Sequence, residues 1–311
     1  VALANAIGFN AAVLGNHEFD FGPDVLIERL KEAKYPVLGS NISYKGKPGF
    51  PGADRSLLIE AGEYKIGLLG LTTTDTPSLS SSGPDVAFSP LAEAAKETSE
   101  ALRGKGADLV IALTHAVYQE DLETLRQVAG IDIVLGGHDH LVLVLYDGKQ
   151  AILKSGSQGN FVGIMDIVID RVESRSGPQL VWQPSFSMVN TLDVEEDPEI
   201  AQQVAGYMAE LDKELAVEIG PTEEVLAAPA HPYTERLIAC VPRLGEPGRR
   251  LEAIPGLPPA VNDLPPGCAF AARCPHAEEA CRQGEITLDA VTAAHQVRCI
   301  KPRSTQARGT A

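Results

Sequence analysis

The sequence lacks a long apolar run, an excess of positive charge and a phosphate-binding loop. No stretch of about 18 consecutive apolar residues occurs, so we expect no membrane-spanning helix. The formal net charge is −16, which argues against nucleic acid or an anionic membrane as the main partner, because like charges repel. The motif Gly-x-x-x-x-Gly-Lys-Ser/Thr is absent, so we do not expect ATP hydrolysis.

Cysteine is absent from most of the chain and concentrated at one end. All five cysteines lie in residues 229–311, as do 11 of the 22 prolines. Residues 1–228 contain 16 Lys or Arg against 34 Asp or Glu, whereas residues 229–311 contain ten against eight. Because three composition measures change at the same place, the sequence predicts two modules joined near Gly220. The alternative is one enzyme with an irregular C-terminus.

The N-terminus lacks the features of a secretion signal, which are a basic segment followed by an apolar one. Residues 1–14 instead read as a helix that runs into a buried strand, so we expect the chain to be an N-terminally truncated fragment. Thiolate chemistry favours a reducing compartment, and we therefore expect a cytoplasmic location. A signal peptide lost with the N-terminus would instead place the protein in the periplasm or outside the cell.

Short apolar runs alternate with amphipathic segments in the first module. Strands are expected at residues 11–14, 36–41, 65–72, 107–115 and 132–140, and helices at 23–33, 91–103, 120–129 and 197–215. This alternation is typical of an α/β fold. From residue 142 to residue 184 the pattern changes to hairpins, with Asp147-Gly148 between two apolar runs.

Polar side chains follow three of the predicted strands, in the segments AAVLGNHEFD, DLVIALTH and DIVLGGHDH. Ligands of open α/β sheets sit at the carboxyl ends of the strands. We therefore expect one edge of the sheet to collect Asn16, His17, His115, His138 and His140. Amide oxygens and neutral imidazoles bind divalent first-row metals, and a pair of such ions can clamp a phosphoryl group and activate a water. A single strand-end histidine is more often an ordinary hydrogen-bonded residue, but three such ends together favour a metal site.

These motifs resemble those of the calcineurin-like metallophosphoesterases. GNHEFDFG, TH and GGHDH occur in the order of that family, and VLGSNI, GLLGLTTTDTPSLSS and SGSQGNFVGIMDIVID resemble its bacterial 5′-nucleotidase branch. The resemblance covers about residues 1–219. It implies a layered α/β/β/α sandwich, incomplete at the N-terminus, that hydrolyses a phosphoric ester with the help of divalent metal ions. A nucleotide substrate is an analogy with that branch.

The resemblance also implies a metal-binding role for residues at the strand ends. Asn16, His115 and His138 would ligate one metal ion. His140 would ligate the second, with both ions drawn from Mn, Zn, Mg, Co and Fe.

The same resemblance makes His17 the acid that protonates the leaving oxygen, oriented by Asp20, and gives Glu18 a structural role. In the family, an Asp-x-His motif and a Gly-Asp motif precede GNHE and supply the remaining ligands, among them the Asp that bridges the two ions. The sequence contains neither motif before Asn16. The resemblance therefore implies a residual or single-metal site and strongly impaired hydrolysis.

The C-terminal segment, about residues 219–311, resembles the C-terminal extension of oligopeptide/dipeptide ABC transporter ATPase subunits. The strings HPYT, RRLEAIPG and PPGC…RCPHA…C carry this resemblance. It implies a [4Fe-4S] cluster held by Cys268, Cys274, Cys281 and Cys299. On ligand type alone, four thiolates suit iron–sulfur or zinc equally well, and free or disulfide-linked cysteines are the remaining alternative.

The two resemblances leave three interpretations of the whole chain open. The first is a metallophosphoesterase domain at 1–219 followed by a transporter-type region at 220–311. The second is an interaction module that docks on peptide transporter subunits, carried by an inert α/β domain. The third is a chimera without an evolved function as one unit, because the two resemblances overlap around residues 217–222. The fifth cysteine, Cys240, is expected to be a buried small hydrophobe.

Overall fold

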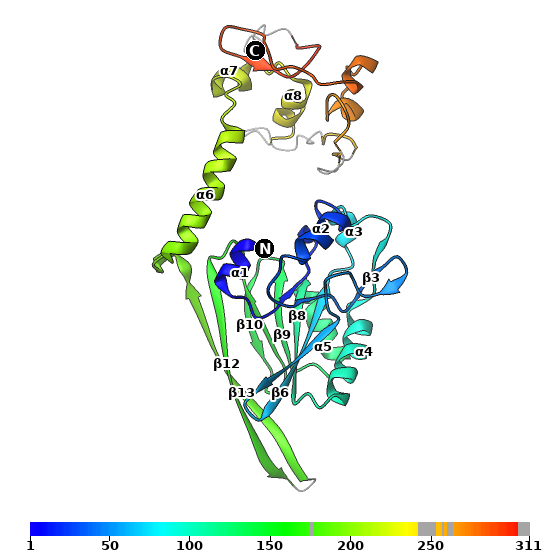
Figure 1. Ribbon diagram of the computed structural model, residues 1–311, viewed down its shortest axis with the longest axis vertical. Coiled ribbons are helices and arrows are strands. Elements are labelled where there is room, and N and C mark those ends of the chain that lie inside the picture. Colours follow the sequence, from blue (N-terminus) through cyan, green and yellow to red (C-terminus); the bar gives the residue numbers. More distant parts are fainter. Residues whose placement is uncertain (175–176, 242–252, 257, 260–263, 304–311) are drawn as a thin grey trace, which may run out of the picture. The chain divides into compact units, whose positions relative to one another are not determined.

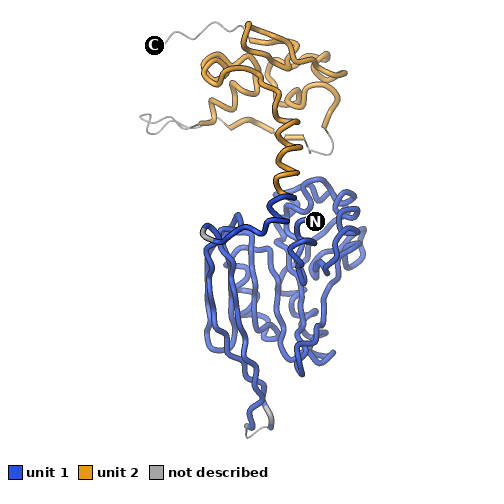
Figure 2. Tube along the Cα trace, turned by 60° about the vertical axis from the view of Figure 1, so that its left-hand side comes forward, with its two compact units in different colours: residues 1–203 blue, residues 204–311 orange. Residues whose placement is uncertain are grey.

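The structure of the protein is a computed structural model that describes residues 1–174, 177–241, 253–256, 258–259 and 264–303. The chain forms two compact units, Val1–Gln203 and Val204–Ala311 (Figure 2). The division falls within helix α6 (Pro198–Leu215). The boundary expected between residues 219 and 220 stays a prediction.

A six-stranded sheet forms the centre of the first unit (Figure 1). Its strands, in spatial order, are β10 (Val142–Tyr146), β11 (Ala151–Ser155), β9 (Ile133–His138), β8 (Leu109–Ala116), β6 (Tyr64–Thr72) and β5 (Ser56–Ala61). The four inner strands run parallel, and β10 and β5 pair antiparallel at the two edges. The strands predicted at 65–72, 107–115 and 132–140 correspond to β6, β8 and β9, and the hairpin at Asp147-Gly148 joins β10 to β11.

Two helices cover one face of this sheet and a long hairpin covers the other. These elements are α4 (Leu91–Gly104), α5 (Tyr118–Gln127), β12 (Phe161–Ser174) and β13 (Gly177–Asn190). Val110 packs with Leu102 and Leu125 of the helices, whereas its neighbour Leu109 packs with Trp182 and Phe186 of the hairpin. This alternation follows from the pleat of the strand, and it buries apolar side chains on both faces. The predicted layered α/β fold is confirmed.

A smaller group of elements comes from the residues before β5 and from those between β6 and β8. Its elements are α1 (Ala2–Ile7), β1 (Ala12–Val13), η1 (His17–Phe19), α2 (Pro23–Leu30), β2 (Val37–Leu38), β3 (Ile42–Tyr44), β4 (Lys47–Pro48), α3 (Thr76–Leu79) and β7 (Val86–Phe88). Phe19 is fully buried, and its ring packs edge-on against Phe50 and Phe88 at centroid distances of 5.5 and 5.6 Å. This packing fixes the short turn η1, which carries His17. A further turn, η2 (Thr191–Asp193), follows β13.

The second unit is built from short elements. Beyond α6 they are α7 (Thr222–Ala227), α8 (Pro232–Ala239), η3 (Ala271–Arg273), η4 (Glu279–Arg282), β14 (Asp289–Ala290) and β15 (Gln296–Val297). His231 caps α8, since its Nδ1 accepts a hydrogen bond from the Tyr233 N–H at 3.0 Å. Cys240 ends α8 half-buried rather than buried, which corrects the expectation. Among the helices that the structure describes, none is long and apolar enough to cross a membrane.

Candidate active site

Three strand ends of the first unit bring polar side chains to one place. Asn16 follows β1, His115 is the last residue but one of β8, and His138 ends β9. β8 and β9 pair in parallel, so the ends of both strands lie at the same edge of the sheet. The Thr72 hydroxyl at the end of β6 donates to the Leu14 carbonyl at 2.6 Å, which ties β1 to that edge.

The Nε2 atom of His115 lies close to polar atoms of two other residues, Asn16 and His138. It lies 2.7 Å from Asn16 Oδ1 and 3.1 Å from His138 Nδ1. The two imidazole centroids are 4.8 Å apart. A Cβ atom at Gly15 would lie 2.7 Å from His115 Nδ1, so the close approach of chain and ring requires a residue without a side chain.

The electrostatic environment keeps the His115 ring neutral. Its pKa is lowered to about 4, first by burial and then by the neighbouring charges of His138 and His17. The imidazole ring is therefore uncharged at neutral pH. A neutral imidazole presents a lone pair, which is the form that binds a cation.

A second group, formed by His17 and Asp20, lies on the turn η1. His17 Nδ1 is 2.8 Å from Asp20 Oδ2, and the His17 side chain is 75% exposed. The Ser80 hydroxyl donates to the other Asp20 oxygen, Oδ1, at 2.9 Å. Sequence analysis missed Ser80, because the contact joins residues 60 positions apart.

Glu18 and His140 complete the set named from the sequence. Glu18 Oε2 accepts a hydrogen bond from the Gly15 N–H at 2.6 Å, which closes the turn after β1. The side chain of His140 is exposed, two residues beyond His138. His138 and His140 both have positive φ angles, 83° and 58°, a backbone conformation that L-residues rarely adopt.

Sequence analysis also missed a buried ion cluster behind these strand ends. Lys154 of β11 is 1% exposed. Its Nζ lies 2.9 Å from Asp121 Oδ2 and 3.0 Å from Asp139 Oδ1. Burial raises the pKa of Asp121 to about 6, against the opposing effect of Lys154. The signal available in the sequence was a lysine inside the apolar run AILKS.

The donors at the strand ends suit one divalent cation in kind. The Asn16 amide oxygen lies 2.7 Å and the His138 imidazole nitrogen 3.1 Å from His115 Nε2, and such groups bind first-row metals. In the part of the chain that the structure describes, no group of three or more His, Cys, Asp or Glu side chains is placed to hold a metal ion. The described residues thus offer one mixed amide–imidazole set, without the carboxylates of a two-ion centre.

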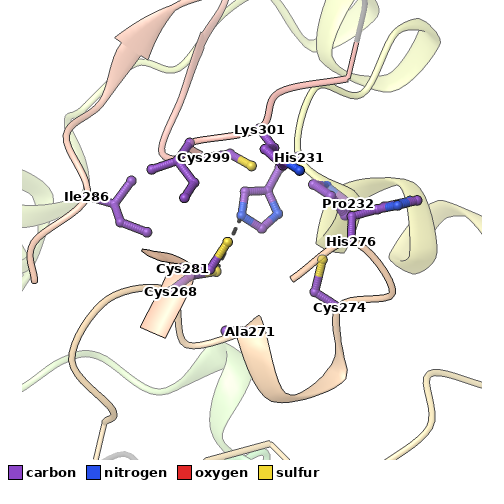
Figure 3. Close-up of a pocket in the computed structure, with 11 residues that line it drawn as sticks. His231, Pro232, Cys268, Ala271, Cys274, His276, Cys281, Ile286, Cys299 and Lys301 are labelled. Atoms are coloured by element: carbon purple, nitrogen blue, oxygen red, sulfur yellow. Dashed lines mark hydrogen bonds between the residues drawn. The ribbon is translucent and has the colours of Figure 1, made fainter. Parts of the chain in front are cut away.

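The four cysteines named from the sequence line one pocket of the second unit (Figure 3). All of them are free thiols, which excludes the disulfide alternative for this structure. The His231 ring also lines the pocket, with Nε2 3.8 Å from Cys268 Sγ. Burial raises the pKa of the Cys299 thiol, and the charges of the other three thiols act in the same direction.

Comparison with known families identifies the two parts of the chain. Residues 3–142 match the family model of the calcineurin-like phosphoesterases. This segment is similar to the calcineurin-like phosphoesterases, and we call the part of the chain that carries it the phosphoesterase domain. Residues 217–281 match the model of the oligopeptide/dipeptide transporter C-terminal region. Both resemblances predicted from the sequence are confirmed.

The relatives of the phosphoesterase domain include several 5′-nucleotidases. Snake venom 5′-nucleotidase of Naja atra is 28% identical over 258 residues, which cover 74% of this chain and 47% of that protein. Human 5′-nucleotidase is 28% identical over 246 residues, covering 70% and 41%. The trifunctional nucleotide phosphoesterase YfkN of Bacillus subtilis is 27% identical over 266 residues, covering 72% and 18%. The chain thus spans less than half the length of these relatives.

A solved structure supports the fold. The 5′-nucleotidase precursor of Thermus thermophilus superposes with a TM-score of 0.60 at 24% identity, covering 70% of this chain and 46% of that one. At this identity the likeness concerns the fold alone.

Proposed function

We propose that the phosphoesterase domain is a metal-dependent phosphoric ester hydrolase of the 5′-nucleotidase type. The observation that carries this proposal is the meeting of Asn16, His115 and His138 at the ends of three strands. Calcineurin-like phosphoesterases use divalent metals, and the relatives named above are 5′-nucleotidases and a nucleotide phosphoesterase. A phosphate ester is therefore the proposed substrate class, and a nucleotide the proposed member of it.

The proposed metal ligands are the three residues that meet at the strand ends, with His140 as the ligand of a second ion. A bound cation supplies positive charge against a phosphoryl group and makes a bound water more acidic. Because the pKa of His115 is lowered to about 4, the ring is uncharged at neutral pH, and one of its two nitrogens presents a lone pair. The amide of Asn16 is buried and held against the His115 ring, which leaves its oxygen in place.

His17 is the proposed acid for the leaving oxygen. When the ring is protonated, Nδ1–H donates to Asp20 Oδ2, which leaves the Nε2 proton for transfer. Ser80 holds the other oxygen of Asp20, so the carboxylate has one orientation. The exposure of the His17 side chain leaves Nε2 open to a bound ester.

The test separates cation binding from turnover. The 311-residue chain, with its cysteine thiols blocked by iodoacetamide so that the second unit cannot bind the ion, is titrated with Co²⁺, and binding is followed by visible absorption. Phosphate release from AMP and p-nitrophenyl phosphate is measured with Mn²⁺. We expect His115→Gln and His138→Gln each to weaken Co²⁺ binding at least about tenfold. The control is Glu100→Gln, which changes an exposed side chain on α4 and should alter neither quantity. Turnover should be slow, because the described donors suit one ion. Undiminished Co²⁺ binding by both variants would refute the proposal.

For the second unit we propose a thiolate-bound [4Fe-4S] cluster and docking on peptide transporter subunits. The support for the cluster is the resemblance of this segment, together with the four cysteines that line one pocket as free thiols. In the structure as described, these thiols are not grouped closely enough to hold a metal ion. The support for the partner is the match of residues 217–281 alone. Iron reconstitution should produce an absorption band at about 400 nm. Cys268→Ser should abolish this band, whereas Cys240→Ser should retain it. A colourless protein with one bound zinc ion would favour the zinc alternative instead.

A further inference from the structure

An ammonium group is buried directly beneath the candidate active site. Lys154 lies on β11 opposite Gly136 of β9, and its side chain is 1% exposed. Its Nζ donates to the carbonyl oxygens of Ala116 and Gly137 at 2.7 and 3.0 Å, and to Asp139 Oδ1 at 3.0 Å. A buried charge without such partners would be strongly destabilising. The lysine therefore connects the end of β8 to the end of β9 through hydrogen bonds to a carbonyl group of each strand.

Asp139 is held at both of its carboxylate oxygens. Oδ1 accepts from Lys154, and Oδ2 accepts from the Tyr118 N–H at 2.6 Å, at the start of α5. The residue stands between His138 and His140, whose φ angles of 83° and 58° are both positive. Such conformations are strained for residues with a side chain and persist only where the surroundings enforce them. The contacts of Asp139 are the restraint at the centre of this strained segment.

Asp121 belongs to the same cluster but takes no part in this restraint. Its Oδ2 forms an ion pair with Lys154 Nζ at 2.9 Å, and its side chain is fully buried. Both side chains pack against Gly136, where an added Cβ would lie 2.9 Å from Asp121 Oδ2 and from Lys154 Cε. Asp121 thus matches Asp139 in charge and in pairing with Lys154, but its other polar neighbour is the Thr114 side chain of β8, not residues 138–140.

We propose that Lys154 and Asp139 are positioning residues for the cation site. Together they fix the backbone conformation of residues 138–140 and so the positions of the His138 and His140 imidazoles. They thereby influence the affinity for a divalent cation, although neither of them contacts the cation. This inference rests on the proposed function, because it assigns these histidines to a cation. It goes beyond it in making the buried pair, rather than the ligands alone, responsible for the geometry of the site.

The experiment compares Asp139→Asn with the matched control Asp121→Asn in the full chain. An asparagine at position 139 must turn its NH₂ group toward either the Lys154 ammonium or the Tyr118 N–H, so one restraint is lost. We expect Asp139→Asn to weaken Co²⁺ binding about 10- to 100-fold. Asp121→Asn should change it by less than about threefold, although both variants lower the unfolding temperature. In metal-free protein, the imidazole NMR signals of His138 and His140 should move in Asp139→Asn and stay in place in Asp121→Asn.

Two results would overturn the proposal. One is a loss of Co²⁺ affinity in both variants that follows their loss of stability. The other is an Asp139→Asn protein with unchanged affinity or unmoved histidine signals. If the unmodified chain binds no Co²⁺, the proposed function fails, and the metal-free NMR comparison still decides the positioning role. If Asp139→Asn does not fold, Asp139→Glu takes its place, since it keeps the charge but displaces the carboxylate.

Discussion

His115 Nε2 and Asn16 Oδ1 lie 2.7 Å apart, although the two residues are separated by 99 positions in the sequence. The contact joins the end of β8, a central strand, to the turn after β1. It exists because the Thr72–Leu14 hydrogen bond fastens β1 beside the sheet and because Gly15 leaves room for the ring. The amide oxygen and the imidazole nitrogen can therefore act on one ligand.

The first prediction concerns acid stability. His115 has a folded-state pKa of about 4, below its ordinary value of 6.5. As the pH falls between these values, the unfolded chain takes up a proton that the folded protein refuses, so stability is lost. From about pH 7.5 to about pH 5 this group should remove about 2 kcal/mol of unfolding free energy. Urea titrations should show a smaller loss in His115→Gln, and identical losses would contradict the low pKa.

The second prediction concerns Asp121, whose contribution to stability changes with pH in the opposite direction to that of His115. The pKa of Asp121 is raised from 3.8 to about 6, because burial outweighs the attraction of Lys154. The folded protein keeps a proton that the unfolded chain has lost, so its contribution is present below pH 3.8 and disappears as the pH rises through about 6. The stability of the unmodified chain relative to Asp121→Asn should fall by on the order of 1–3 kcal/mol between about pH 4 and about pH 7. Parallel pH curves for the two proteins would contradict this.

The third prediction tests the glycine beside the ring. A side chain at Gly15 would lie 2.7 Å from His115 Nδ1, so Gly15→Ala should displace the ring and destabilise the protein by about 1–3 kcal/mol. It should also weaken Co²⁺ binding. Gly104 ends α4 with nothing within 4 Å of an added Cβ. Gly104→Ala should be neutral or stabilising by about 0.5–1 kcal/mol, and equal effects of both variants would exclude the steric explanation.

The fourth prediction addresses the acid group. Removing the Ser80 hydroxyl takes away a hydrogen bond to Asp20 that contributes about 1 kcal/mol. Ser80→Ala should therefore slow Mn²⁺-dependent phosphate release about three- to tenfold, while the unfolding temperature falls by only about 2–4 °C. Ser78→Ala is the control, because the Ser78 hydroxyl bonds only to the nearby Asp75 carbonyl among the described contacts. If the Ser80→Ala and Ser78→Ala proteins release phosphate at the same rate, the orientation of Asp20 by Ser80 does not contribute to turnover.

Local pattern predicted the central elements well and the outer ones less well. β6, β8 and β9 lie inside the sheet, so their sequences are long apolar runs that can be recognised without knowing the neighbours. The strand expected at 36–41 shrinks to Val37–Leu38. The next two backbone N–H groups bond to the Asp54 and Gly70 carbonyls instead of extending the ladder with β1. Those partners lie far along the chain, so periodicity could not reveal them.

The sequence by itself determined the α/β layering, the division of composition between two parts, and the order of polar motifs at strand ends. These properties depend on side-chain periodicity and residue type, which are local. Only the tertiary structure decided that Asn16, His115 and His138 meet, that Ser80 reaches Asp20, and that a buried Lys154 joins Asp121 to Asp139. Such meetings depend on strand register and loop closure between distant segments. No short stretch of sequence contains that information.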